Sequence, residues 1–183
     1  GQIFRYGAGG SWQEQPHNLT GTLTNSSTYL YNEGKIAVKQ DLTLVGTSGQ
    51  EDSVEVKYTV TNNDTTVHQV GIRIMMDTKV GGIDASLFKV GLQSVTQSTI
   101  FDGTNIPETW YGVDTLGTPS TIAKGSSLLT QTHTPDRFIL GHWNTMSDNP
   151  WDYTYNCSLG DSGVAMYWNP IAVNQASNQE FKL

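Results

Sequence analysis

The chain has 183 residues, which is long enough for one domain to bury a sizeable hydrophobic core without disulfides or metals. Only 15% of the residues are charged and the net charge is −7, so we expect no binding to nucleic acid or to anionic membrane surfaces, which both reward clustered lysine and arginine. The single cysteine, Cys157, excludes an intrachain disulfide, and no apolar run is long enough to predict membrane insertion.

Two segments in the first third of the chain show the clearest strand pattern. Residues 35–45 and 54–61 alternate apolar and polar side chains with a period of two, which predicts two half-buried strands on either side of a Gly- and Ser-rich turn. The residues at 62–64 tolerate left-handed turn conformations, so we predict that the second strand forms a hairpin with a third strand at 67–76. Ahead of these strands, the Gly-rich residues 1–16 carry aromatic rings that we expect to pack on the core.

The rest of the chain is less regular. We predict two short strands within 87–101, a helical turn near 107–111 and a short strand at 128–134. Residues 137–140 and 162–168 are mostly apolar runs of the length of buried strands, and we expect a last strand close to the C-terminus. No segment keeps an apolar period of 3.6 residues over the length of a helix.

These elements predict an all-β fold. Roughly ten to thirteen short strands separated by turn signals are typical of a β-sandwich, and their number favours an enlarged antiparallel β-sandwich. The sequence shows neither an internal repeat nor a linker, so we expect a single domain over residues 1–183. We interpret it as one module of a longer extracellular protein.

The stretch 136–155 is the most informative for function. It joins a short apolar run to aromatic, carboxylate and amide side chains gathered around one proline. Aromatic faces can cover the apolar face of a sugar ring while fixed polar groups bind its hydroxyls, so this composition predicts a saccharide-binding site. The predicted ligand-binding residues are Trp143, Trp151, Tyr153, Asp148, Asn149, Asp152, His142 and Trp110. The alternative is that these rings belong to the core, as we expect for Trp168, which lies in an apolar strand.

Trp110 belongs to this set for a different reason from the others. Together with Tyr111 it lies in a second irregular stretch, where the two rings could form another wall of the same site. His142 follows the apolar run at 137–140 and could donate a hydrogen bond to a sugar hydroxyl.

The sequence predicts no metal-binding residues, no cofactor and no catalytic activity, and it leaves open whether a calcium ion is bound. Neither HxH nor HExxH spacing is present, and the loop aspartates do not form a calcium-binding loop of the EF-hand type. Those aspartates are Asp77, Asp84, Asp102, Asp148, Asp152 and Asp161. A GxSxG nucleophile motif and a Gly-rich phosphate loop are also missing, and a sequence cannot report the separation of two carboxylates that a glycosidase requires.

Three segments carry a resemblance to a known family. Residues 71–78 (GIRIMMDT), 136–153 and 161–170 (DSGVAMYWNP), in this order, resemble β-sandwich modules of large bacterial cell-surface proteins. The starch-adherence proteins of gut bacteria are one such case. The chain is also similar to the supersandwich of galactose-mutarotase-type enzymes, although the histidine pair and glutamate of those enzymes have no match here. The resemblance implies a supersandwich-like fold and attachment to polysaccharide.

We therefore predict a non-catalytic carbohydrate-binding module of a bacterial extracellular or cell-surface protein. The expected partners are a polysaccharide or oligosaccharide, with α-glucan (starch) as the first choice, and other modules of the same polypeptide. Two alternatives remain open. One is an adhesion or spacer module that contacts protein, and the other is a sugar-processing, mutarotase-like enzyme.

Overall fold

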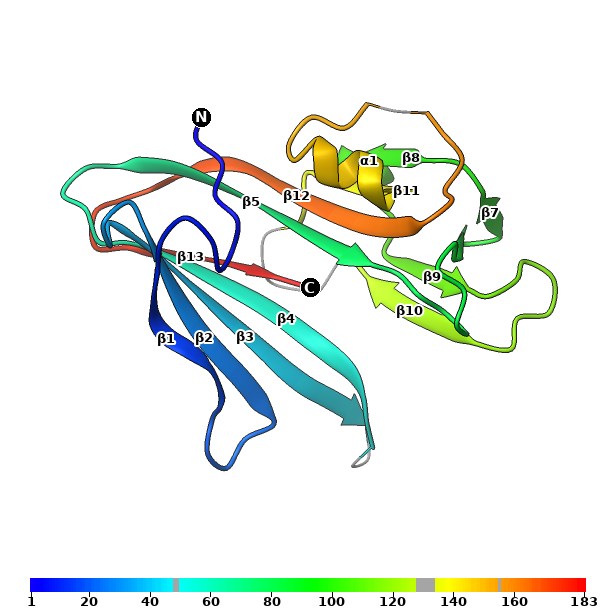
Figure 1. Cartoon of the computed structure of the whole chain (residues 1–183), viewed down its shortest axis with the longest axis horizontal. Helices are drawn as coiled ribbons and strands as arrows, with labels where there is room; N and C mark the ends of the chain where they lie inside the picture. The colour runs from blue at the N-terminus through cyan, green and yellow to red at the C-terminus, as the bar shows by residue number, and fades with distance from the viewer. Residues whose placement is uncertain (48–49, 128–133, 155) are drawn as a thin grey trace. The chain divides into compact units, whose positions relative to one another are not determined.

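The computed structural model describes residues 1–47, 50–127, 134–154 and 156–183 (Figure 1). The described strands are antiparallel and form three sheets, which confirms the predicted all-β, sandwich-like fold. The chain divides into two compact units. Unit 1 comprises Gly1–Val70 with Pro170–Leu183, and unit 2 comprises Gly71–Asn169.

Unit 1 contains a five-stranded sheet with the order β1-β2-β3-β4-β13 (Figure 1). Its strands are β1 (Ser11–Asn18), β2 (Thr24–Tyr31), β3 (Ile36–Thr47), β4 (Gln50–Asn62) and β13 (Asn178–Lys182). Cross-strand pairs in register share a face, so Tyr29, Val38 and Val60 lie on one side of the sheet. The period-two pattern of the sequence therefore predicts β3 and β4 correctly, because one face of each strand is apolar.

The aromatic residues of the N-terminus pack against this apolar face. The ring centroid of Phe4 lies 4.9 Å from that of Tyr31, and the rings of Tyr6 and Trp12 lie 6.0 Å and 4.8 Å from that of Tyr29. Such tilted and edge-to-face contacts are the arrangements that aromatic pairs prefer. The N-terminal rings thus pack as the sequence predicts.

The hairpin predicted between residues 54–61 and 67–76 is wrong. A strand does follow, β5 (His68–Asp77), but β4 pairs with β3 and β13 while β5 lies in another sheet beside β12. The reason lies at Asn62, whose buried Nδ2 donates to the carbonyl oxygens of Thr66 and Val173, at 2.7 and 2.9 Å. These bonds fix the chain after β4 in a wider turn, and β13 occupies the position beside β4 that β5 would need.

Unit 2 contains two four-stranded sheets. Their orders are β10-β9-β6-β7 and β5-β12-β11-β8. Besides β5, the strands are β6 (Leu87–Val90), β7 (Gln93–Val95), β8 (Thr99–Asp102), β9 (Thr109–Val113), β10 (Ile122–Ser126), β11 (Arg137–His142) and β12 (Ser162–Val173). The unit boundaries fall inside β5, after Val70, and inside β12, after Asn169.

Aromatic rings form the core between the two sheets of unit 2. Trp110 on β9 lies 6.0 Å from Phe88 on β6 and 6.0 Å from Phe138 on β11, measured between ring centroids. Phe101 on β8 also packs against Phe138, at 5.8 Å. These contacts join one sheet to the other and make unit 2 a sandwich.

Helical structure is scarce among the described residues. A 3₁₀ turn, η1 (Gly103–Asn105), and one short helix, α1 (Trp143–Asp148), are present. The helical turn predicted near 107–111 is wrong, because Thr109–Val113 pairs with both β10 and β6 as a strand. Of the strand predicted at 128–134, residues 128–133 lie outside the described residues. In the described ranges, no helix has the length and apolar character required to cross a bilayer.

Candidate functional site

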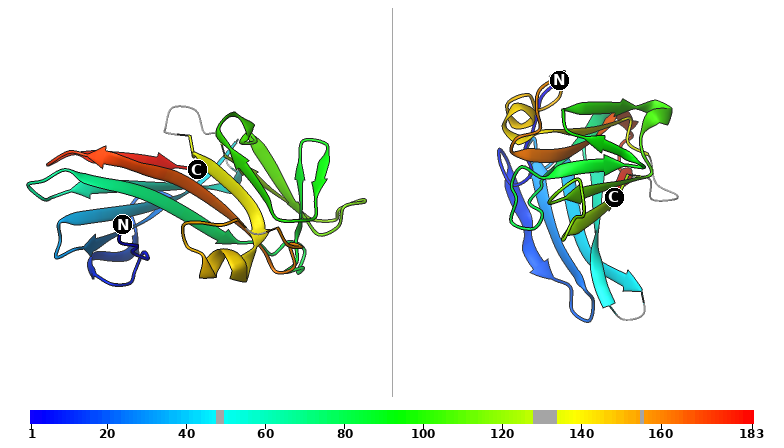
Figure 2. Two further views of the ribbon diagram at one scale, coloured as in Figure 1. Left: turned by 90° about the horizontal axis from the view of Figure 1, so that it is seen from above. Right: turned by 90° about the vertical axis from the view of Figure 1, so that its right-hand side faces the viewer.

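The predicted site falls on a segment that covers one face of the sheet β5-β12-β11-β8. We call residues 143–153 the cover segment; it consists of α1 and the loop that follows it (Figure 2). Beneath it, Ile139, Ala165 and Tyr167 on the sheet form a buried cluster with Met146 of α1 and with Tyr153. The cover segment is therefore held by the burial of Met146 in α1 and of Tyr153 at its end.

Two glycines explain why the cover segment can approach the sheet so closely. Gly141 on β11 and Gly163 on β12 lie opposite each other. A Cβ atom at Gly141 would lie 2.9 Å from the Oη of Tyr153, and one at Gly163 would lie 2.9 Å from the Cε of Met146 and 3.2 Å from the Cε3 of Trp143. The missing side chains leave the space into which α1 and Tyr153 pack.

Two of the predicted ligand-binding rings are buried. Tyr153 is 0% exposed, and its hydroxyl shares a hydrogen bond of 2.8 Å with the Oγ of Ser98. Burial raises the pKa of Tyr153. Trp110 is 6% exposed within the aromatic core of unit 2. Neither ring can offer a face to a sugar, so the prediction for both residues is wrong: they stabilise the fold.

Trp143 and Trp151 are each partly exposed, but they do not form one continuous surface. Trp143 lies against Gly163, and Trp151 packs edge-on against Tyr167 with a centroid distance of 5.7 Å. Gly163 and Tyr167 are four residues apart on the same face of β12, a separation of about 13 Å. The two indoles therefore lie at two separate positions along the cover segment.

The polar residues of the predicted site divide into exposed and structural groups. Asp148 and Asp152 are exposed and available to a ligand. Asn149 is half-buried, and its Nδ2 donates to the carbonyl oxygen of Thr145 at 2.8 Å, which satisfies one of the carbonyls at the C-terminus of α1. His142 is half-buried at the start of the same helix, with Nδ1 3.4 Å from the Oγ1 of Thr145.

Sequence reasoning missed a row of side chains that crosses the same sheet beneath Trp151. Arg73 on β5, Tyr167 on β12, Arg137 on β11 and Asp102 on β8 lie on consecutive strands. The guanidinium carbons of Arg73 and Arg137 lie 5.4 and 5.9 Å from the centroid of the Tyr167 ring, so this ring stands between two cations. The Nε of Arg137 donates to the Oδ1 of Asp102 at 2.9 Å.

Opposing effects act on the pKa of Tyr167 in this row. Burial raises the pKa of its hydroxyl, while the two arginines act in the opposite direction. Arg73 has a second role, because its Nη2 donates to the carbonyl oxygen of Met146 at 2.8 Å and so holds the C-terminal half of α1. This row becomes apparent only from the register of the strands, in which Arg137 is opposite both Tyr167 and Asp102.

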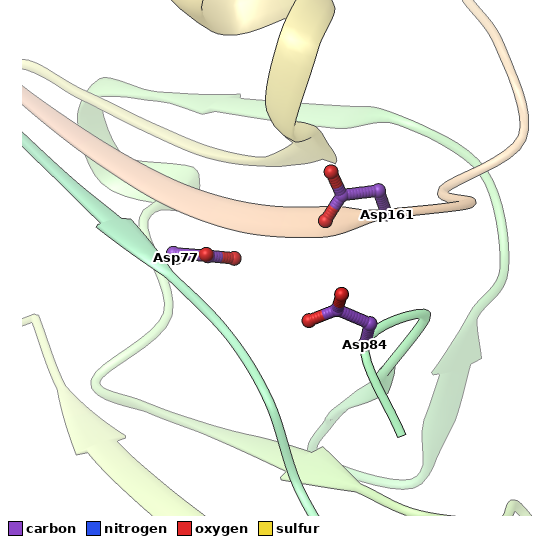
Figure 3. A group of neighbouring side chains, drawn as sticks. All are labelled: Asp77, Asp84 and Asp161. Atoms are coloured by element: carbon purple, nitrogen blue, oxygen red, sulfur yellow. The ribbon is translucent and has the colours of Figure 1, made fainter. Parts of the chain in front are cut away.

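Three of the loop aspartates gather at one end of this sheet (Figure 3). Asp77 ends β5, Asp84 lies in the loop after it, and Asp161 directly precedes β12. One carboxylate oxygen from each lies within 4.8 Å of the others, and the backbone N–H of Ser162 donates to the carbonyl oxygen of Asp84 at 3.2 Å, which ties two of the segments together. Such oxygen donors suit a hard cation such as Ca²⁺, so these are the residues of the described chain that could hold one.

Comparison of the chain with protein-family models, with curated proteins and with solved structures finds no match. The structure defines an all-β, sandwich-like protein whose unit 2 carries two partly exposed indoles, two exposed carboxylates and a row of charged and aromatic side chains on one covered face.

Proposed function

We propose that the chain is a non-catalytic carbohydrate-binding module of a bacterial extracellular protein, with an α-glucan such as starch as the first candidate ligand. The observation that carries the proposal is the partial exposure of Trp143 and Trp151 in the same short segment as the exposed Asp148 and Asp152. Aromatic faces next to fixed hydrogen-bond acceptors are what a saccharide requires of a protein surface.

The packing of Trp151 supports a binding role for its ring. Its edge-on contact with the buried Tyr167 holds the indole in place before any ligand arrives, so little side-chain entropy would be lost on binding. One stacked ring contributes about 0.5–1.5 kcal/mol beyond its area term. A site with one or two such rings would have a Kd of about micromolar to millimolar.

Affinity electrophoresis in gels that contain soluble starch, xylan or mucin tests the proposal. We expect the wild-type chain to be retarded by one of these glycans, and Trp151→Ala and Trp143→Ala to migrate as they do in a gel without glycan. Trp12→Ala is the matched control, because Trp12 is also a partly exposed indole but lies in unit 1. Thermal unfolding of each variant checks that it is folded.

The outcomes separate the proposal from its alternatives. Wild-type protein that no glycan retards, with no glycan shifting its tryptophan fluorescence, would favour an adhesion or spacer module. Turnover of a small sugar would favour a mutarotase-like enzyme. Equal loss of binding in Trp12→Ala and in the two cover-segment variants would show that the rings act through stability rather than by contact.

A further inference from the structure

The most solvent-accessible ion pair of the covered sheet shares a neighbour, Tyr167, with Trp151. The side chain of Arg137 is 37% exposed and that of Asp102 is 60% exposed, and they are joined by the 2.9 Å contact from Nε to Oδ1. In the part of the chain that the structure describes, Arg137 makes its hydrogen bond through Nε, and Asp102 accepts through Oδ1. The two terminal amino groups of Arg137 and the Oδ2 of Asp102 therefore remain for another partner.

This ion pair and Trp151 are positioned by the same buried ring. Tyr167 is 2% exposed; the indole of Trp151 lies 5.7 Å from its centroid and the guanidinium carbon of Arg137 lies 5.9 Å from it. Arg137 is also fixed by its place on β11, between β12 and β8. A planar guanidinium that is held through Nε and lies over a ring is already oriented for a ligand, which lowers the entropic cost of binding.

The charges around Tyr167 compensate one another. Arg73 and Arg137 contribute two cations. Two carboxylates balance them: that of Asp152 acts on the hydroxyl of Tyr167, and that of Asp102 pairs with Arg137. A site with no excess of positive charge does not favour an anionic ligand, and the net charge of −7 disfavours one further. A neighbouring donor and acceptor of this kind match the adjacent hydroxyls of a neutral sugar, each of which can both accept and donate.

We propose that Arg137 and Asp102 form the hydrogen-bonding half of a saccharide subsite in which Trp151 is the stacking half, and that its ligand is a neutral polysaccharide. This inference rests on the proposed function and adds two residues and a ligand class to it. The terminal amino groups of Arg137 donate to ring hydroxyls, the Oδ2 of Asp102 accepts from an adjacent hydroxyl, and the indole covers the apolar face of the same ring.

Substitutions that keep the shape of the pair test the proposal. Asp102→Asn removes the charged acceptor, and Arg137→Lys keeps the positive charge but removes the planar fork. We expect each to weaken binding to soluble starch by about tenfold or more, since each removes a hydrogen bond to a charged group. Arg137→Gln, which removes the charge as well, should weaken binding at least as much.

The matched control is Glu55→Gln in unit 1. Glu55 pairs with Lys182 across β4 and β13, and both side chains are partly exposed, so the variant breaks a comparable ion pair away from the subsite. Its affinity for starch should equal that of the wild type. Alginate, a polymer of anionic sugars, serves as the charged probe, and thermal unfolding of every variant confirms that it is folded.

The results distinguish failure of this inference from failure of the proposed function. Should Trp151→Ala lose starch binding while Asp102→Asn and Arg137→Lys bind as the wild type does, the subsite is refuted and carbohydrate binding stands. Preference of the wild type for alginate, with stronger binding by Asp102→Asn, would refute the neutral ligand class. A wild-type chain that binds no glycan removes both proposals.

Discussion

The clearest test of the site's architecture is to fill the space left by the paired glycines. In Gly141→Ala the new Cβ would lie 2.9 Å from the Oη of Tyr153 and 3.1 Å from the Sδ of Met146. Met146 can adjust, but Tyr153 is 0% exposed and its hydroxyl is bonded to Ser98, so the ring or the strand must move.

The expected magnitude follows from two opposing terms. An alanine in a strand gains about 0.4–1 kcal/mol through the smaller entropy of the unfolded chain. Overpacking of a filled core costs about 1–3 kcal/mol. The net loss should be about 1–2 kcal/mol, which corresponds to a fall in Tm of about 2–8 °C for a chain of this size.

Near-UV circular dichroism during thermal unfolding measures this change, with Gly117→Ala as the control. A Cβ at Gly117 would meet no atom within 4 Å, so this substitution should leave Tm unchanged or raise it slightly. The double variant Gly141→Ala/Tyr153→Phe should lose less stability than the sum of the losses in Gly141→Ala and Tyr153→Phe. The reason is that the hydroxyl that the new Cβ meets is absent from the double variant. The reasoning fails if Gly141→Ala unfolds at the same temperature as Gly117→Ala.

Three further predictions concern charge and packing. Asp84→Asn should raise the free energy of unfolding by about 0.5–1 kcal/mol in low salt, and Tm with it, because repulsion with Asp77 and Asp161 is relieved, and the gain should vanish in 1 M NaCl; calorimetry that finds no gain in low salt contradicts it. The hydrogen bond from His68 lowers the pKa of Asp64 to about 2, below its ordinary 3.8, so this carboxylate stabilises the fold above pH 3.8 and the stabilisation is lost as the pH falls through 2. Asp64→Asn should therefore lower Tm at pH 6 and have a smaller effect at pH 2, and an equal effect at both pH values would be inconsistent with this linkage. Trp151→Ala should cost about 1–3 kcal/mol in urea unfolding, less than a fully buried tryptophan, because only part of its ring packs on Tyr167; an unchanged midpoint would mean that this packing contributes nothing.

The fold class could be predicted because it depends on local patterns. The alternation in residues 35–45 and 54–61 reflects one apolar face per strand, and β3 and β4 lie there. Pairing is not local, however. The hairpin between β4 and β5 was predicted from turn residues alone, whereas the buried side chain of Asn62 and the last strand of the chain decide where β4 finds its partners.

The candidate site could be predicted only as a segment. Trp151 and Tyr153 are two residues apart in the same Asp- and Asn-rich stretch, yet one ring is partly exposed and the other is buried. The difference arises from Gly141 and Gly163, whose missing side chains admit Tyr153 and α1 but carry no signal that links them to that stretch. Arg137 and Asp102 are 35 residues apart, and only the pairing of β11 with β8 joins them.

The most direct test of carbohydrate binding by the cover segment is a fluorescence titration with starch-derived oligosaccharides. We predict a saturable change in tryptophan emission in the wild type and in Trp12→Phe, and its loss in the double variant Trp143→Phe/Trp151→Phe. A response that persists in the double variant would contradict the account, as would a wild-type protein whose emission stays constant with starch, xylan and mucin alike.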